Sequence, residues 1–244
     1  MGKVLLVTGA GRGIGAAIAR AAGKEGYRVA VNYSRSKDAA ESVVRDIAAG
    51  GGEAIAIQGD MASERDIVAL FETLDRTYGP LDALVNNAGI IGPHGRVDAV
   101  GAQPIAELLA VNVTGAFLCA REAVRRMSTA HGGKGGAIVN IGSAATRLGG
   151  SGEYVPYAAS KAAINTMTIG LAKEVALEGI RVNTVEPGLI VTDIHYEGRL
   201  EKLGPTVPMG RVAPPEEVAG PVLFLLSDAA SYITGSIVTV TGGR

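Results

Sequence analysis

Hydrophobic and polar positions along the chain repeat on two length scales. Short runs rich in Val, Ile and Leu predict seven strands, at residues 3–8, 28–33, 53–58, 82–87, 137–142, 181–186 and 236–241. Longer segments with helical spacing of apolar residues predict helices near 13–25, 38–49, 63–78, 104–130, 157–178 and 215–227. This alternation predicts an α/β fold, a doubly wound Rossmann-type parallel sheet of about seven strands with helices on both faces.

The composition favours a protein that acts on small molecules. The chain has 244 residues, of which 47% are hydrophobic, so we expect a single domain over residues 1–244. A net charge of -1 without a basic tract argues against nucleic acid or an anionic membrane surface as a partner. The N-terminal residues lack the features of a signal peptide, and we expect a cytoplasmic protein without a membrane span, with Cys119 as a buried small hydrophobe.

A glycine-rich stretch, VTGAGRGIGAA, joins the first predicted strand to the first helix. In an α/β sheet this turn places backbone N–H groups and a helix N-terminus where a pyrophosphate binds. The spacing is G-x-x-x-G-x-G, not G-x-G-x-x-G, and a tight turn without a ligand is the alternative. The residues expected to contact the dinucleotide here are Gly9, Gly11, Arg12, Gly13, Ile14 and Gly15.

The end of the second strand bears on the choice between the two nicotinamide dinucleotides. An acid there would bind the ribose 2′-hydroxyl of NAD(H), whereas this chain has Ser34 and Arg35. Arg12 is a second cation able to bind a 2′-phosphate, although either arginine is also explained as a surface charge. We therefore expect NADP(H) to be preferred, with NAD(H) still open.

Tyr157 and Lys161 lie four positions apart in SGEYVPYAASKAA. Residues at this spacing share one face of a helix, and Pro156 fits only the first helical turn. Tyr154 is therefore expected outside the helix or at its frayed edge. By itself the pair is more typical of a solvated helix surface than of a catalytic site.

Several motifs occur together in a characteristic order. They are the glycine loop, NNAG at 86–89, Ser143, YAASK at 157–161 and PG at 187–188. In this combination the chain resembles the short-chain dehydrogenase/reductase family over essentially its whole length. The stretch VNYSRSKDAAE is similar to both 3-oxoacyl carrier-protein reductases and glucose-dehydrogenase-like members.

The resemblance implies four catalytic residues. Tyr157 would be the general acid/base, Lys161 its electrostatic partner and a ligand of the nicotinamide ribose, and Ser143 a hydrogen-bond donor to the substrate oxygen. Asn112 would hold a water in a proton relay, unless it merely caps or kinks a helix. Because a free phenol has a pKa near 10, the neighbouring ammonium is expected to lower the pKa of Tyr157.

The same resemblance assigns further cofactor contacts, and one position departs from it. The implied contacts, besides Tyr157 and Lys161, are Asp60, Met61, Asn87, Ala88, Gly89, Pro187, Gly188, Ile190 and Thr192. Thr241 stands where the family often has an acid.

The implied function is NADP(H)-dependent hydride transfer between nicotinamide and a carbonyl or secondary alcohol. A sugar or alcohol dehydrogenase running towards oxidation, a non-catalytic dinucleotide-sensing regulator and a methyltransferase are alternatives. Family members are commonly homotetramers. The substrate loop is expected near 188–214, and the pocket near Ile91, His94, Arg147, Glu153, Tyr154, His195 and Tyr196, with no role assigned to His94 or His195.

Overall fold

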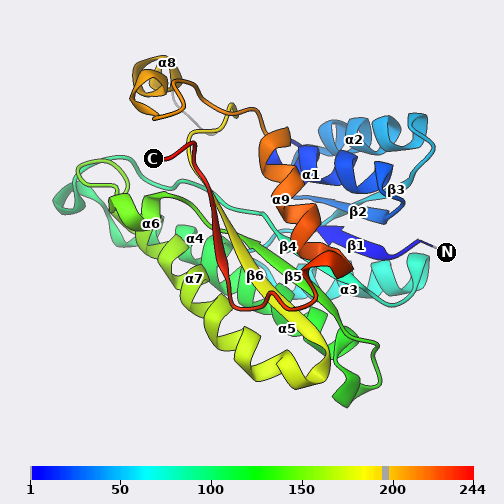
Figure 1. Ribbon diagram of the computed structural model, residues 1–244. Helices are drawn as coiled ribbons and strands as arrows, with labels where there is room; N and C mark the ends of the chain where they lie inside the picture. Colours follow the sequence, from blue (N-terminus) through cyan, green and yellow to red (C-terminus); the bar gives the residue numbers. More distant parts are fainter. Residues whose placement is uncertain (1, 194–197) are drawn as a thin grey trace.

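The computed structural model contains a seven-stranded sheet in the order β3-β2-β1-β4-β5-β6-β7, and every pair of neighbouring strands is parallel (Figure 1). The structure describes residues 2–193 and 198–244. The strands are β1 Val4–Val7, β2 Arg28–Tyr33, β3 Glu53–Gln58, β4 Ala83–Asn86, β5 Gly136–Ile141, β6 Ile180–Pro187 and β7 Ile237–Val240. All seven predicted strands are thus confirmed, together with the fold class.

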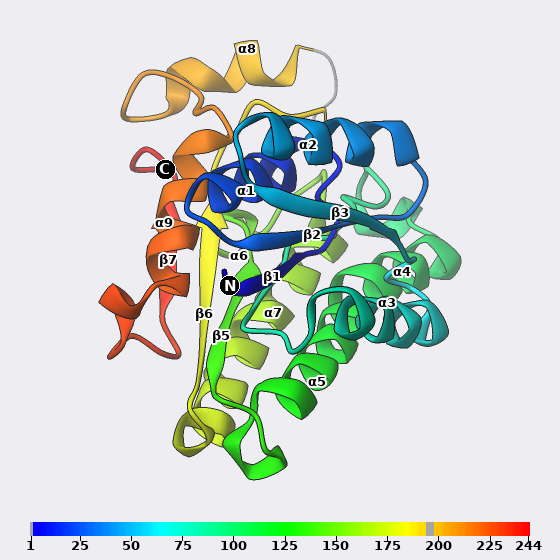
Figure 2. The same cartoon turned by 90° about the vertical axis from the view of Figure 1, so that its right-hand side faces the viewer.

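Helices cover both faces of the sheet (Figures 1 and 2). They are α1 Gly13–Lys24, α2 Lys37–Ala49, α3 Glu64–Tyr78, α4 Ala102–Leu109, α5 Ala116–Met127, α6 Ala145–Leu148, α7 Val155–Val175, α8 Arg199–Leu203 and α9 Glu216–Leu226. Strand residues alternate between the two faces, as β geometry requires. On β1, Leu5 and Val7 pack with α1, α2 and α9, whereas Val4 and Leu6 pack with α3, α5 and α7.

The order of the strands creates a switch point beside β1. Because β1 pairs with both β2 and β4, the chain turns to opposite sides of the sheet after these strands, and proteins of this fold bind ligands at the carboxyl ends of the strands at this point. The glycine loop, Asn87 and the segment after β6 all follow strands that end at this edge. Helix α8 lies above the same edge in Figure 1, close to the C-terminus. His195 and Tyr196 lie outside the described residues.

The helix predicted over 104–130 differs from the observed one. Helices α4 and α5 are joined by a π-helical segment, Ala110–Gly115, which contains Asn112. The helical stretch Ala102–Met127 is long and apolar enough to cross a membrane by length and composition alone. In this fold, however, Cys119, Ala123 and Met127 on α5 are buried in the core beneath the sheet. The expected absence of a membrane partner therefore stays a prediction.

Candidate active site

The glycine loop is held in place by buried polar side chains of the neighbouring strands. The backbone N–H of Gly9, which has a φ of 61°, donates to Oδ1 of Asn32 at 3.0 Å. The amide of Asn87 donates to the carbonyl oxygens of Thr8 and Gly9 at 2.8 and 3.0 Å. The Thr8 hydroxyl in turn accepts the N–H groups of Asn87 and Ala88. The loop and the NNAG segment therefore form one rigid unit.

The residues of this loop fit a dinucleotide phosphate. Helix α1 starts after Arg12, and among the residues that the structure describes no side chain caps its first N–H groups. Its first turn also carries no acid, so the positive end of the helix dipole is left for an anion. A Cβ at Gly15 would lie 2.4 Å from Nδ2 of Asn87 and one at Gly13 would lie 3.2 Å from Cγ2 of Thr192. Only glycine therefore permits this close packing around the helix start.

The expected contacts with the 2′-phosphate lie on an exposed surface. Ser34 and Arg35 follow β2 and are exposed. Arg12 is exposed as well, and its Nη1 lies 2.5 Å from Oδ2 of Asp193. This ion pair, which the sequence patterns did not predict, connects the glycine loop to the segment after β6.

The pair that opens α7 points inward, away from solvent. Helix α7 begins after Tyr154 with Pro156 in its first turn, as predicted, although Tyr154 itself is buried. Lys161 is buried, and its Nζ donates to the carbonyl oxygen of Ile141 at 2.8 Å. The same Nζ lies 5.9 Å from the centre of the half-buried Tyr157 ring. A solvated surface pair, the alternative reading of this spacing, is thereby excluded.

The protonation behaviour of the pair differs from the expectation. Burial raises the pKa of Tyr157, while a hydrogen bond with the Ser143 side chain opposes this increase. Burial also lowers the pKa of Lys161 to about 8. The expected lowering of the Tyr157 pKa by the ammonium is therefore not seen in this structure, where burial of the phenol is the largest influence on its pKa. Lys161 therefore loses its proton at a much lower pH than an ordinary lysine does.

Asn112 lies next to this pair and has a full set of hydrogen bonds. Its Oδ1 accepts the N–H of Ile90 at 2.8 Å, and its Nδ2 donates to the carbonyl oxygen of Ile90 and to Oγ of Ser160. A Cβ at Gly89 would lie 3.3 Å from both Oδ1 of Asn112 and Nζ of Lys161. The side chains of Asn112 and Lys161 therefore lie close together, next to the Cα of Gly89. The π-helical turn, a feature common at functional sites, places Asn112 there.

The remaining predicted contacts lie along the same edge of the sheet. Asp60 is exposed and accepts the N–H of Ala62, while Met61 is buried. Ile190 is buried, the hydroxyl of Thr192 lies 3.4 Å from its carbonyl oxygen, and Gly188 donates to Val240. The carbonyl oxygen of Pro187 accepts the N–H of Ala144, next to Ser143. Apart from Tyr157 and Lys161 on α7, the predicted cofactor contacts therefore lie on the glycine loop or on segments at or after the carboxyl ends of the strands.

Sequence patterns missed a buried polar network beneath the site. The amide of Asn86 donates to Asn140 at 2.9 Å, and Asn140 donates to Thr168 of α7 at 2.8 Å. The hydroxyl groups of Thr168 and Thr184 are 2.7 Å apart. These bonds join β4, β5 and β6 to the helix that carries Tyr157. Isolated Asn and Thr residues inside apolar strand patterns were the available signal.

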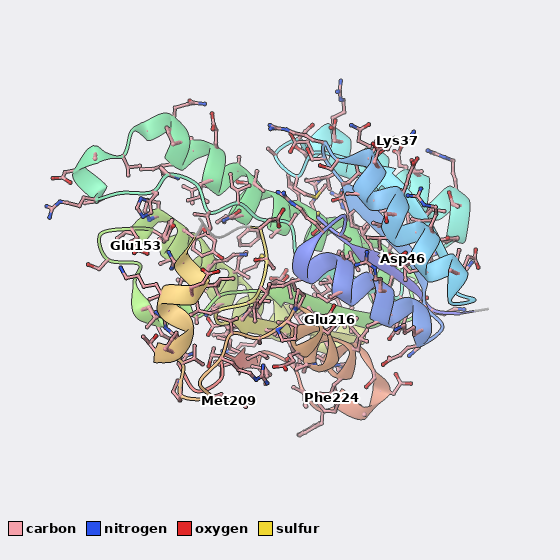
Figure 3. All side chains as sticks on the ribbon, turned by 90° about the horizontal axis from the view of Figure 1, so that it is seen from above. Lys37, Asp46, Glu153, Met209, Glu216 and Phe224 are labelled. Atoms are coloured by element: carbon pink, nitrogen blue, oxygen red, sulfur yellow. The ribbon has the colours of Figure 1, made fainter. Side chains whose placement is uncertain are left out.

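A second group of contacting residues joins α8 to the segments that precede α7 and follow β4. Arg199 of α8 donates to Oε2 of Glu153 at 2.8 Å, and its guanidinium lies 4.9 Å from the centre of the Tyr154 ring. The His94 ring meets Tyr154 edge-on at 5.0 Å between centroids. Figure 3 shows Glu153 beside the short helix α8. The structure thus brings together three residues of the predicted pocket, His94, Glu153 and Tyr154, whereas Arg147 points towards the C-terminal residue Arg244.

Comparisons with known proteins agree with this arrangement. Residues 9–244 match the family model described as enoyl-(acyl carrier protein) reductase. The chain is 50% identical to the uncharacterized oxidoreductase YgfF of Escherichia coli, over 99% of both chains. It is 41% identical to a 3-oxoacyl-[acyl-carrier-protein] reductase of Synechocystis, over 99% of this chain and 96% of that protein.

A solved structure gives the same result for the fold. A short-chain dehydrogenase/reductase from Serratia marcescens superposes with a TM-score of 0.92 at 35% identity, covering 100% of this chain and 98% of that one. Sequence and structure therefore agree over nearly the whole length. This chain belongs to the short-chain dehydrogenase/reductase family, the NAD(P)-dependent oxidoreductases that act on CH–OH and C=O groups.

Proposed function

We propose that the protein is an NADP(H)-dependent reductase of a small carbonyl compound, with Tyr157 as the general acid. The observation that carries this proposal is that the side chains of Tyr157 and Ser143 interact, and that the buried Lys161 lies near the Tyr157 ring and next to Gly89. Bound NADPH would supply the hydride. Hydride addition builds negative charge on the carbonyl oxygen, so the site needs a proton donor and fixed hydrogen-bond donors at that oxygen.

The side chains of the site can meet this need. The raised pKa of Tyr157 keeps the phenol protonated near neutral pH, ready to give its proton to the substrate oxygen. The Ser143 hydroxyl would donate a hydrogen bond to the same oxygen. Lys161, buried on the same helix face, would stabilise the phenolate that remains. Asn112, whose side chain lies near that of Lys161 beside Gly89, would hold a water that returns the proton.

The preference for NADP(H) rests on charge near the adenine ribose. Arg12 and Arg35 are both exposed, and no acid follows β2. A guanidinium binds a 2′-phosphate through paired charge-assisted hydrogen bonds. A higher catalytic efficiency with NADH than with NADPH would contradict this preference.

The substrate is the least defined part of the proposal. Relatives named 3-oxoacyl-[acyl-carrier-protein] reductase and versicolorin reductase, at about the same identity, differ widely in the ketones that their names imply. The aromatic and charged residues that meet next to α8, His94, Tyr154 and Arg199, suit a polar ketone, quinone or sugar. The reverse reaction, oxidation of an alcohol or sugar, uses the same groups with Tyr157 as base.

A screen for NADPH consumption over a panel of carbonyl compounds tests cofactor, direction and substrate class together. Tyr157→Phe should abolish turnover and leave NADPH affinity unchanged, as measured by fluorescence titration. Tyr78→Phe is the matched control. Tyr78 is a buried tyrosine on α3, and its hydroxyl has no hydrogen-bond partner among the described residues. If Tyr157→Phe reduced carbonyls at the wild-type rate, the proposed mechanism would be wrong.

The protein is further proposed to be a cytoplasmic homotetramer. On helix α7, the large apolar side chains of Val155 and Ile169 are 39% and 40% exposed. Exposed apolar patches mark sites of contact between protein chains. On α5, Phe117 is exposed as well, at 50%. A monomeric mass by light scattering would contradict assembly through these helices.

A further inference from the structure

A buried carboxylate lies directly beneath the loop that carries Ser143. Glu186, near the end of β6, is 2% exposed. Its Oε1 accepts hydrogen bonds from Oγ1 of Thr146 at 2.6 Å and from Nδ2 of Asn165 at 2.8 Å. Nε of Arg147 lies 3.8 Å from its Oε2. Three elements, α6, α7 and β6, therefore meet at one side chain.

A carboxylate at this position is costly unless it is used. Burying a charge without full pairing costs several kcal/mol, and a well-packed apolar residue is often more stable at such a site. Val182, four residues earlier on the same face of β6, is apolar and buried, so this face accepts apolar side chains. Arg147, the nearest cation, is itself half exposed and is not in direct hydrogen-bond contact. Stability alone therefore does not account for Glu186.

The partners of Glu186 point to the catalytic serine. The Thr146 hydroxyl also lies 3.0 Å from the carbonyl oxygen of Ser143, and the Thr146 N–H donates to the same oxygen at 3.1 Å. A Cβ at Gly142 would lie 3.0 Å from Cγ of Glu186, so the stem of the carboxylate rests on the residue before Ser143. Glu186 thus contacts the Ser143 loop at both ends.

The other partner belongs to the helix of the tyrosine. Asn165 lies one helical turn after Lys161 on α7 and faces β6 through its bond to Glu186. A single oxygen atom therefore connects the loop of Ser143 with the helix that carries Tyr157 and Lys161. The distance between the Ser143 hydroxyl and the Tyr157 phenol depends on this connection.

We infer that Glu186 is a positioning residue that sets Ser143 against Tyr157 through Thr146 and Asn165. The inference rests on the proposed roles of Ser143 and Tyr157 in carbonyl reduction. In this role Glu186 does not contact the substrate or the cofactor. It acts by fixing the positions of Ser143 and Tyr157, which contact the substrate. A misplacement of about 1 Å in such groups can lower a rate about 100-fold.

The test compares kcat and KM in a small set of variants. Glu186→Ala should lower kcat by about 10- to 100-fold and leave the KM for NADPH within about 2-fold of wild type. Glu186→Gln should keep kcat within about 3-fold, because an amide oxygen can accept both hydrogen bonds. Thr146→Val should lower kcat in the same direction, and the double variant with Glu186→Ala should be no slower than Glu186→Ala alone.

Glu122→Ala is the matched control. Glu122 is also a buried carboxylate held by arginines, on α5 and away from Ser143, so its loss should lower stability without lowering the kcat of the folded fraction. The solvent deuterium isotope effect on kcat should rise in Glu186→Ala, because proton transfer becomes slower, and should be unchanged in Glu122→Ala. A wild-type kcat in Glu186→Ala would overturn the inference.

The design separates this inference from the proposed function. Tyr157→Phe is measured in the same assay. If Tyr157→Phe is inactive while Glu186→Ala is fully active, only the role of Glu186 is wrong. If Tyr157→Phe is active, the proposed mechanism fails as well. If Glu186→Ala does not fold, Thr146→Val alone decides, and an unchanged kcat and isotope effect in that variant would refute the role of Glu186.

Discussion

Replacing Lys161 by methionine should change how the free energy of unfolding depends on pH. In the folded protein the pKa of the Lys161 ammonium is about 8, against an ordinary lysine value of 10.5. Between these values the unfolded chain binds more protons than the folded one, so the contribution of Lys161 to stability rises with pH. Below pH 8 the buried charge is destabilising. The difference corresponds to about 3 kcal/mol, an order-of-magnitude figure.

Urea unfolding at about pH 7 and about pH 10.5 measures this difference at one protein concentration. The free energy of unfolding of wild type, relative to Lys161→Met, should rise by about 3 kcal/mol between the two pH values. Lys173→Met is the control, because Lys173 is exposed on the same helix and should show almost no relative change. Taking the difference between the two pH values removes the part of the free-energy change that does not depend on pH, which comes from the packing of methionine and the lost hydrogen bond to Ile141. A pH-independent difference between wild type and Lys161→Met would refute the reasoning.

Three further predictions follow from the site. Asp193→Asn should lower the KM for NADPH about 2- to 5-fold without affecting NADH, because it releases Arg12 from an exposed ion pair; equal effects on both cofactors would contradict this. Gly15→Ala should destabilise the fold by about 1–3 kcal/mol in urea, because its Cβ would lie 2.4 Å from the Asn87 amide; an unchanged midpoint would show that the loop adapts. In carbonyl reduction, kcat should fall as pH rises above about 8, where Lys161 loses its proton. A kcat that stays constant to about pH 10 would contradict the proposal that the Lys161 ammonium stabilises the Tyr157 phenolate.

The fold could be predicted because the apolar residues repeat with clear strand and helix periods along the sequence. Runs such as KVLLVT and EAIAIQ are short, apolar and separated by helical patterns, so strand positions and the parallel sheet follow from spacing. The irregular elements could not be predicted in this way. Helices α6 and α8 are short, four and five residues, and their positions depend on tertiary contacts such as the pairing of Arg199 with Glu153. The single-domain organisation remains a prediction.

The candidate site shows the same division. The spacing of Tyr157 and Lys161 indicated a shared helix face, and the structure places them together. Spacing carries no information about solvent, however, so the sequence argument expected charge attraction to control the Tyr157 pKa, whereas burial does. Glu186 was missed for a related reason. A single acid in an apolar strand indicates a buried group, but its partners, Thr146 and Asn165, come from distant parts of the chain.

The π-helical turn at Ala110–Gly115 makes the site sensitive to chain length at one point. A π turn holds one residue more than an α turn, and each residue rotates a helix by about 100°. Removing a single residue between Leu109 and Ala116 would restore regular α-helix and swing the carboxamide of Asn112 away from Ile90 and Ser160. Deleting one residue of Ala110–Gly115 would thus abolish the proposed role of Asn112 in catalysis, even where the packing of α5 in the core is kept.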